Sequence, residues 1–193
     1  MEILKYLENT FRVLNVFHDD VAASEDLLNV DDTPFHRRQY IRNLFSAYES
    51  SIWNYKQLCL QIAEKEEGVY LEPHELTFLR ETDFKLQENG KFKEKTVKVS
   101  FKANVLGTVE ILNKVLGTSI TIDSGSGEWR EFIKAVGIRD VITHPKDLES
   151  FDISDKQLNT VKSSFRWFLE TFHRPVMFVS LENVHIIESE TVA

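Results

Sequence analysis

Apolar residues recur at steps of three and four along most of this chain, which is the period of an amphipathic helix. The first such run extends from the N-terminus to about residue 29. Its apolar positions are Leu4, Leu7, Phe11, Leu14, Phe17 and Val21. The second run begins at Pro34, behind the capping residue Thr33, and ends where a charged stretch meets Gly68. We therefore predict two long helices in the first third of the chain.

Four shorter helical patterns follow. Glu72 opens a third helix that continues towards Leu86 and closes at Asn89 and Gly90. The fourth, fifth and sixth patterns are clearer, and they cover about residues 105–116, 128–143 and 154–173. The pattern predicts an all-α bundle of about five to six helices.

Two stretches depart from the helical period. Residues 91–100 are rich in lysine and alternate only loosely, which indicates a mobile connection or a short strand. His173, Arg174 and Pro175 are expected to end the sixth helix. The run 176–181 that follows is typical of a strand, and residues 184–187 could pair with it or with a partner chain. We expect minor extended segments at the C-terminus.

Composition indicates the cellular compartment in which the protein is expected. The chain has 193 residues, one cysteine and a net charge of −8. A single cysteine excludes an intramolecular disulfide and a cysteine-rich zinc site, as expected in a reducing compartment. The N-terminus is amphipathic rather than signal-like, and no apolar run reaches the ~18 residues that a membrane span requires. We expect a cytoplasmic protein with no membrane partner.

The heptapeptide from Arg139 to Pro145 carries the strongest candidate chemistry. Pro145 disfavours helical geometry at His144, so we expect this histidine in the last turn of the fifth helix or just past it. If that turn is helical, Asp140 and His144 share one side, where the carboxylate can hold and charge the imidazole. Such a group suits phosphate chemistry, because guanidinium offers a planar donor fork and imidazole transfers protons near neutral pH.

An ordinary helix end explains the same residues. Basic side chains and histidines favour the last turn because they offset the helix dipole and bond to free carbonyls. Glu49, next to Tyr48 on the second helical run, is open to two interpretations as well. It is either a glutamate at the boundary of the apolar stripe or the residue that orients Arg139 or His144.

Arg139, Asp140 and His144 resemble the motif of the HEPN superfamily, the higher eukaryotes and prokaryotes nucleotide-binding domain. That motif is an arginine, a polar residue and then a histidine, and four residues separate Arg139 from His144 here. The second helical run also resembles that superfamily, with Arg38, Arg42, Glu49 and several aromatic residues. A tryptophan-led helix then runs into the motif, as it does in members of the superfamily.

The resemblance implies one HEPN-like helical domain over residues 1–193. Its core would cover about residues 34–173, with an insertion near 90–100. The first helix, residues 1–30, and the tail, residues 175–193, would be additions. Bundles of this superfamily dimerise and bring two copies of the motif into one cleft. Many members are metal-independent ribonucleases, often toxin or defence components, and others have lost catalysis and serve as binding modules.

The resemblance also assigns roles to residues. His144 would transfer protons, Arg139 would clamp phosphate, and Asp140 would support both as the third catalytic residue. The further supporting residues would be Glu49, Arg42 and Thr143. Neither a cofactor nor a metal ion is expected. Members of the superfamily often have asparagine where this chain has Asp140.

Three functions stay open on the sequence. The first is a homodimeric, metal-independent endoribonuclease that cleaves single-stranded RNA by attack of the 2′-hydroxyl group, with an antitoxin or another protein as a candidate partner. The second is a catalytically inactive HEPN-like module that binds a nucleotide, RNA or a protein partner. The net charge of −8 favours the second, since capture of RNA depends on cations that neutralise phosphates. The third is a helical scaffold with a well-capped helix at His144.

Overall fold

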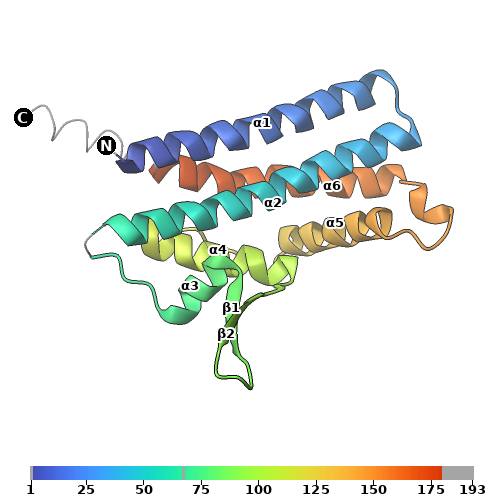
Figure 1. The fold of residues 1–193 in the computed structure, drawn as a ribbon. Coiled ribbons are helices and arrows are strands. Elements are labelled where there is room, and N and C mark those ends of the chain that lie inside the picture. The colour runs from blue at the N-terminus through green and yellow to red at the C-terminus, as the bar shows by residue number, and fades with distance from the viewer. Residues whose placement is uncertain (1, 67, 180–193) are drawn as a thin grey trace, which may run out of the picture.

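The structure, a computed structural model, describes residues 2–66 and 68–179, with side chains from Lys5 onward. These residues form an all-α fold of six helices with one small two-stranded sheet, as the helical period predicted (Figure 1). The helices are α1 (Glu2–Val30), α2 (Pro34–Lys65), α3 (Pro73–Arg80), α4 (Phe101–Leu116), α5 (Gly127–Thr143) and α6 (Asp155–Phe168). The strands are β1 (Thr82–Leu86) and β2 (Phe92–Thr96).

Helix α2 lies at the centre of the bundle and contacts each of the other five helices. Thr33 caps its N-terminus by accepting a hydrogen bond from the backbone N–H of His36 at 3.2 Å, and Pro34 occupies the first turn, where no donor is needed. Tyr48, in the middle of α2, is fully buried among phenylalanine rings of the other helices. Those rings belong to Phe101, Phe132, Phe165 and Phe168.

Helices α5 and α6 pack against each other, and both also contact α2. Ser126 caps α5 by accepting a hydrogen bond from the backbone N–H of Trp129 at 3.1 Å. Trp129 is buried, and its ring lies 5.7 Å from that of Trp167 on α6. This packing fixes the direction in which α5 runs, and therefore the place where Arg139 emerges.

The third helix is shorter than the sequence indicated. It ends at Arg80, and Glu81 adopts a left-handed conformation with φ of 54°. This reverses the chain into a hairpin, in which Thr82 pairs with Thr96 and Leu86 with Phe92. The expected continuation of the helix to Leu86 was wrong. The short run of residues 82–86 fits the alternation of a strand as well as a weak helical period, and in the structure it is a strand.

The expectation of a strand after Pro175 was also wrong for the described residues. Leu169–His173 form a π-helical turn, and the chain continues as a helix over residues 174–179. In that turn the backbone N–H of Arg174 donates to the carbonyl of Leu169. The widened turn carries the helix past Pro175, which has no N–H to donate and would crowd the preceding turn of a regular helix. Residues 180–187, where the rest of the strand and its pairing were expected, lie outside the described residues.

No helix within the described residues combines the length and hydrophobicity needed to cross a lipid bilayer.

Candidate functional site

Arg139 lies in the penultimate turn of α5, where its guanidinium contacts two carboxylates. One Nη atom donates to Glu49 of α2, and the other donates to Asp140 Oδ1 at 3.0 Å. The Arg139 side chain is 21% exposed, whereas those of Glu49 and Asp140 are 54% and 56% exposed. If Glu49 had a role in the site, we expected it to orient either Arg139 or His144. The structure shows the contact with Arg139.

Two phenylalanine rings lie under the same guanidinium. Its central carbon is 5.3 Å from the centre of the Phe45 ring on α2 and 6.0 Å from that of Phe101 on α4. The ring face is the negative side of the aromatic quadrupole, so both rings attract the cation. Three helices therefore hold Arg139 in one orientation before any ligand arrives.

Open hollows surround this arginine. A hollow of about 620 Å³ lies between α2, α4 and α5, and its lining includes Glu49, Trp53 and Arg139. A second hollow, of about 330 Å³, lies on the other side of Glu49 and Arg139 and includes Arg42 and Thr143. The guanidinium thus lines two solvent-accessible spaces at once.

His144 is the first residue past α5, in agreement with the position expected from Pro145. Its backbone N–H closes the helix by donating to the carbonyl of Asp140 at 3.0 Å, and its φ of −126° and ψ of 62° are no longer helical. Its side chain is exposed and lines a third hollow, of about 470 Å³, together with Asp140 and Val141. Asp140 lines both the first and the third hollows.

The expected pairing of the Asp140 carboxylate with the His144 imidazole is absent from the described residues. The carboxylate bonds to Arg139 instead. The expectation assumed helical geometry through residue 144, and the departure of His144 from the helix removes the stacking of side chains four apart. His144 reaches solvent without a side-chain partner among the described residues.

Thr143 and Arg42 have different surroundings. The Thr143 hydroxyl donates to the carbonyl of Arg139 at 2.8 Å, which is an ordinary bond within one helix. Arg42 is exposed on α2 and lines the second hollow, and none of the described residues forms a hydrogen bond or ion pair with its guanidinium. Its guanidinium is therefore free to meet an anion.

Sequence reasoning did not find the aromatic residues of the site. Neither Phe45 nor Phe101 was given a role in the site. The sequence did contain a signal for where α4 starts. Ser100 caps this helix by accepting a hydrogen bond from the backbone N–H of Ala103 at 3.3 Å, which places Phe101 in the first turn. The contact with Arg139 depends on how α4 and α5 cross, which no local pattern encodes.

The described residues contain no group of three or more histidine, cysteine or acidic side chains arranged to hold a metal ion. The chain matches no protein-family model, no curated protein and no solved structure. Membership of the HEPN superfamily therefore stays a prediction that rests on the motif at Arg139, Asp140 and His144.

Proposed function

We propose that this protein is a metal-independent endoribonuclease of HEPN type that cleaves single-stranded RNA. The observation that carries the proposal is the guanidinium of Arg139, held on two aromatic faces and open to two hollows, with His144 exposed one turn along the same helix end. An oriented planar cation and a solvent-accessible imidazole supply charge stabilisation and proton transfer, the two needs of phosphodiester cleavage.

RNA carries its own nucleophile. His144 removes the proton from a 2′-hydroxyl group or protonates the leaving 5′-oxygen, and Arg139 stabilises the charge that develops on the phosphorus oxygens. The products are a 2′,3′-cyclic phosphate and a free 5′-hydroxyl. A positioned acid or base contributes about 10²- to 10⁴-fold, and a donor aimed at developing charge contributes about 10²- to 10³-fold.

One motif supplies one histidine, whereas the reaction uses both a base and an acid. A second copy of the chain, packed so that two motifs face each other, provides both. The apolar side chains that flank His144 support such packing, because Val141 is 49% exposed and Leu148 is 85% exposed. Both side chains are therefore available for contact with a second copy of the chain.

Incubation of single-stranded RNA with purified protein in excess EDTA tests the proposal. We expect Arg139→Ala and His144→Ala each to reduce the cleavage rate at least about 100-fold. Arg166→Ala and His74→Ala are matched controls, since both residues are exposed on other helices and line none of the three hollows. Equal cleavage by all five proteins, or cleavage lost on chelation, contradicts the proposal.

A second function is favoured by the two carboxylates on Arg139. Glu49 and Asp140 together offset more than the single charge of the guanidinium, which weakens its attraction for phosphate. The protein would then be a catalytically inactive HEPN-like module that binds a nucleotide, RNA or a protein partner. A nucleotide-induced rise in melting temperature, lost in Arg139→Ala and accompanied by no RNA cleavage, distinguishes this function from the first.

A further inference from the structure

The β1–β2 hairpin projects from the helical bundle (Figure 1). Its base is Glu81, whose carboxylate accepts a hydrogen bond from the buried ammonium of Lys56 at 2.8 Å. Glu81 also lines the hollow of about 620 Å³ that contains Arg139. The hairpin therefore stands at the rim of the candidate site and is tied to the core there.

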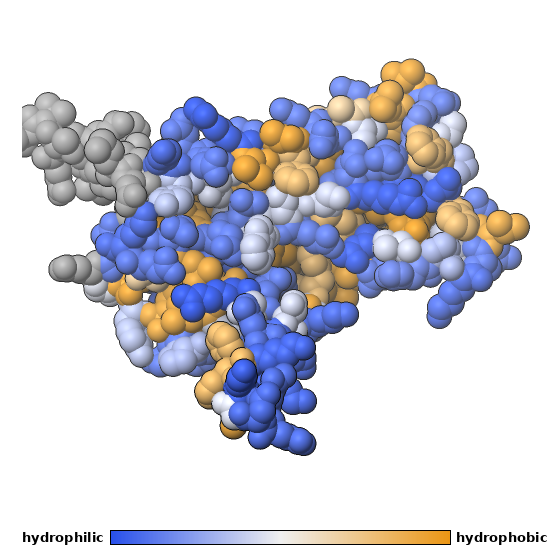
Figure 2. All heavy atoms as spheres, viewed as in Figure 1, coloured by the Kyte–Doolittle hydropathy of each residue, from blue (hydrophilic) through white to orange (hydrophobic). Residues whose placement is uncertain are grey.

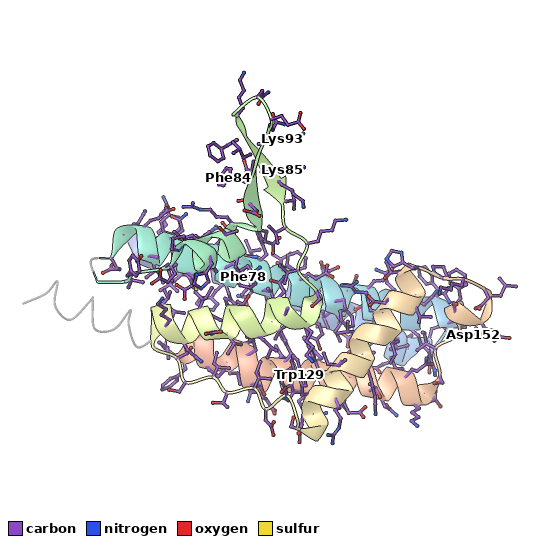
Figure 3. The ribbon with its side chains drawn as sticks, turned by 90° about the horizontal axis from the view of Figure 1, so that it is seen from below. Phe78, Phe84, Lys85, Lys93, Trp129 and Asp152 are labelled. Atoms are coloured by element: carbon purple, nitrogen blue, oxygen red, sulfur yellow. The ribbon has the colours of Figure 1, made fainter. Side chains whose placement is uncertain are left out.

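The pairing register gives the hairpin two unlike faces. Residues directly opposite each other in an antiparallel pair share a face, and neighbours along a strand alternate between faces. Phe84, Leu86 and Phe92 fall on one face together with Glu94. The other face carries Asp83, Lys85, Lys93 and Lys95. Phe84 and Lys85 point to opposite sides in Figure 3, and Figure 2 shows apolar residues along one side of the projection and polar residues along the other.

The face that carries Lys85, Lys93 and Lys95, here called the lysine face, is electrostatically unfavourable by itself. Lys85 lies directly opposite Lys93, and like charges in that relation destabilise a strand pair. Asp83 opposite Lys95 is the one acidic residue on this face of the sheet. None of the described residues forms an ion pair with these three lysines. An isolated two-stranded hairpin is already marginal in water, so a bound polyanion would stabilise this one.

Further lysines connect the hairpin to Arg139. Lys98 is exposed in the segment that leaves β2, and Lys102 is exposed on the first turn of α4. Lys102 lines the same hollow as Arg139. The backbone positions of Lys93 and Lys95, two apart on one strand, are separated by about 6.6 Å, and both side chains leave the same face.

We propose that the lysine face of the hairpin, defined by Lys85, Lys93 and Lys95, binds the phosphate backbone of single-stranded RNA and directs the strand into the hollow at Arg139. This rests on the proposed function for the identity of the polyanion. It explains how a chain of net charge −8 captures RNA, because positive charge is concentrated beside the site rather than spread over the surface.

The test measures the affinity of a fluorescently labelled single-stranded oligoribonucleotide by anisotropy over a salt series, in a His144→Ala background that prevents cleavage. The test variant carries Lys85→Gln, Lys93→Gln and Lys95→Gln. The matched control carries Lys5→Gln, Lys134→Gln and Lys156→Gln, three exposed lysines on helices α1, α5 and α6, and it has the same net charge.

We expect the test variant to bind RNA at least about tenfold more weakly, and the slope of log affinity against log salt to fall by about 2 for three lost phosphate contacts. The control should stay within about twofold of the His144→Ala protein, because charge far from the strand is screened. A third variant with arginine at all three hairpin positions should bind normally, which separates charge from hairpin folding.

The outcomes separate the two proposals. Equal affinity of the test and control variants overturns the lysine face while leaving the ribonuclease proposal intact. If binding depends on the hairpin lysines but the unaltered protein does not cleave RNA, the lysine face is supported and the ribonuclease proposal is overturned. Equal loss in the glutamine and arginine variants overturns the lysine face, and it points to protein docking or folding through the apolar face. Failure of the unaltered protein to bind RNA at low salt overturns both proposals.

Discussion

Lys56 and Arg139 are two cations in matching surroundings, at different depths. Each contacts carboxylate oxygen and phenylalanine ring faces, with one carboxylate and one ring at Lys56 and two of each at Arg139. The Lys56 ammonium is 2.8 Å from Glu81 Oε1 and 4.0 Å from the centre of the Phe78 ring. Yet the Lys56 side chain is 0% exposed, whereas that of Arg139 is 21% exposed and lines two hollows.

Packing behind the rings explains the difference. A Cβ atom at Gly107 of α4 would lie 2.8 Å from Phe78 Cζ, so Phe78 is in close contact with α4 and leaves no space beside Lys56. Burial lowers the pKa of Lys56, while the hydrogen bond that its ammonium donates to Glu81 opposes that change. Similar partners therefore produce a structural cation where the ring is sealed and a candidate ligand-binding cation where the ring is open.

Removal of the carboxylate at Lys56 should give the largest loss of stability. We expect Glu81→Ala to lower the free energy of unfolding by about 3 to 5 kcal/mol, because it leaves the buried ammonium without its counter-charge, and the Phe78 carbonyl, 3.4 Å from Nζ, remains as its hydrogen-bond partner among the described residues. Glutamate and alanine both carry a Cβ atom, so both have the same unfavourable backbone energy in the left-handed conformation of residue 81. The change in stability therefore reports on the loss of the charge. Urea unfolding at neutral pH measures it.

Lys56→Met is the matched variant. Methionine fills the same volume and packs well on Phe78, and Glu81 retains access to water, with its side chain 32% exposed. We expect a loss of about 1 kcal/mol or less, and a similar loss for the double variant, because removal of both charges leaves none buried unpaired. Equal losses in the two single variants would show that packing, not charge, makes Lys56 structural.

A buried histidine on the other side of α2 should make stability depend on pH. His173 shares a hydrogen bond with Tyr55, the residue before Lys56, and its ring centre is 4.7 Å from that of His18. Burial, aided by His18, lowers the pKa of His173 to about 4. The unfolded chain, with a pKa near 6.5, then binds more protons than the folded protein between these values, so stability is full above pH ~6.5 and falls towards pH ~4.

The expected loss between pH 7.5 and pH 5 is about 2 kcal/mol, measured by urea unfolding. Burial also lowers the pKa of His18, which adds to the loss in the same direction. His173→Gln keeps a hydrogen-bonding side chain and cannot titrate, so its stability should change less over this range. An unchanged pH dependence in that variant would contradict the assignment to His173. Lys56 and Arg139 variants are therefore best compared above pH 7.

The parts of the fold that sequence predicted are those governed by local rules. Thr33 and Pro34 start α2 where the sequence indicated, α6 begins next to the predicted residue 154, and the apolar stripes predicted α1, α2, α4, α5 and α6. A short strand was one of the two expectations for residues 91–100, and β2 lies there. The partner strand β1 and the continuation past Pro175 were missed for one reason. Short apolar runs fit both periods, and the choice between them depends on contacts from elsewhere, such as Lys56 on Glu81 and the burial of Val176.

In the candidate site, too, some residues could be predicted from local patterns and others depend on contacts between distant segments. The motif singled out Arg139 and His144, and the edge of the α2 stripe singled out Glu49. The ring faces of Phe45 and Phe101 could not be predicted, since they depend on where α4 crosses α5. Lys93 and Lys95 belong to the lysine-rich stretch visible in the sequence, but Lys85 was not grouped with them, because their shared face depends on the pairing of Lys85 with Lys93.

Removal of the carboxylate at Arg139 should give the smallest effect on stability. Glu49→Gln should change the free energy of unfolding by less than about 1 kcal/mol, because Glu49 is largely exposed and water replaces its contact with the guanidinium. Urea unfolding of Glu49→Gln beside Glu81→Ala, at one pH above 7, tests the contrast between the two cations. A loss of more than about 2 kcal/mol in Glu49→Gln would make Arg139 as structural as Lys56 and weaken the case for a phosphate ligand. A small loss, combined with tighter binding of inorganic phosphate or RNA, would mean that Glu49 holds the arginine in place and competes with its anionic ligand.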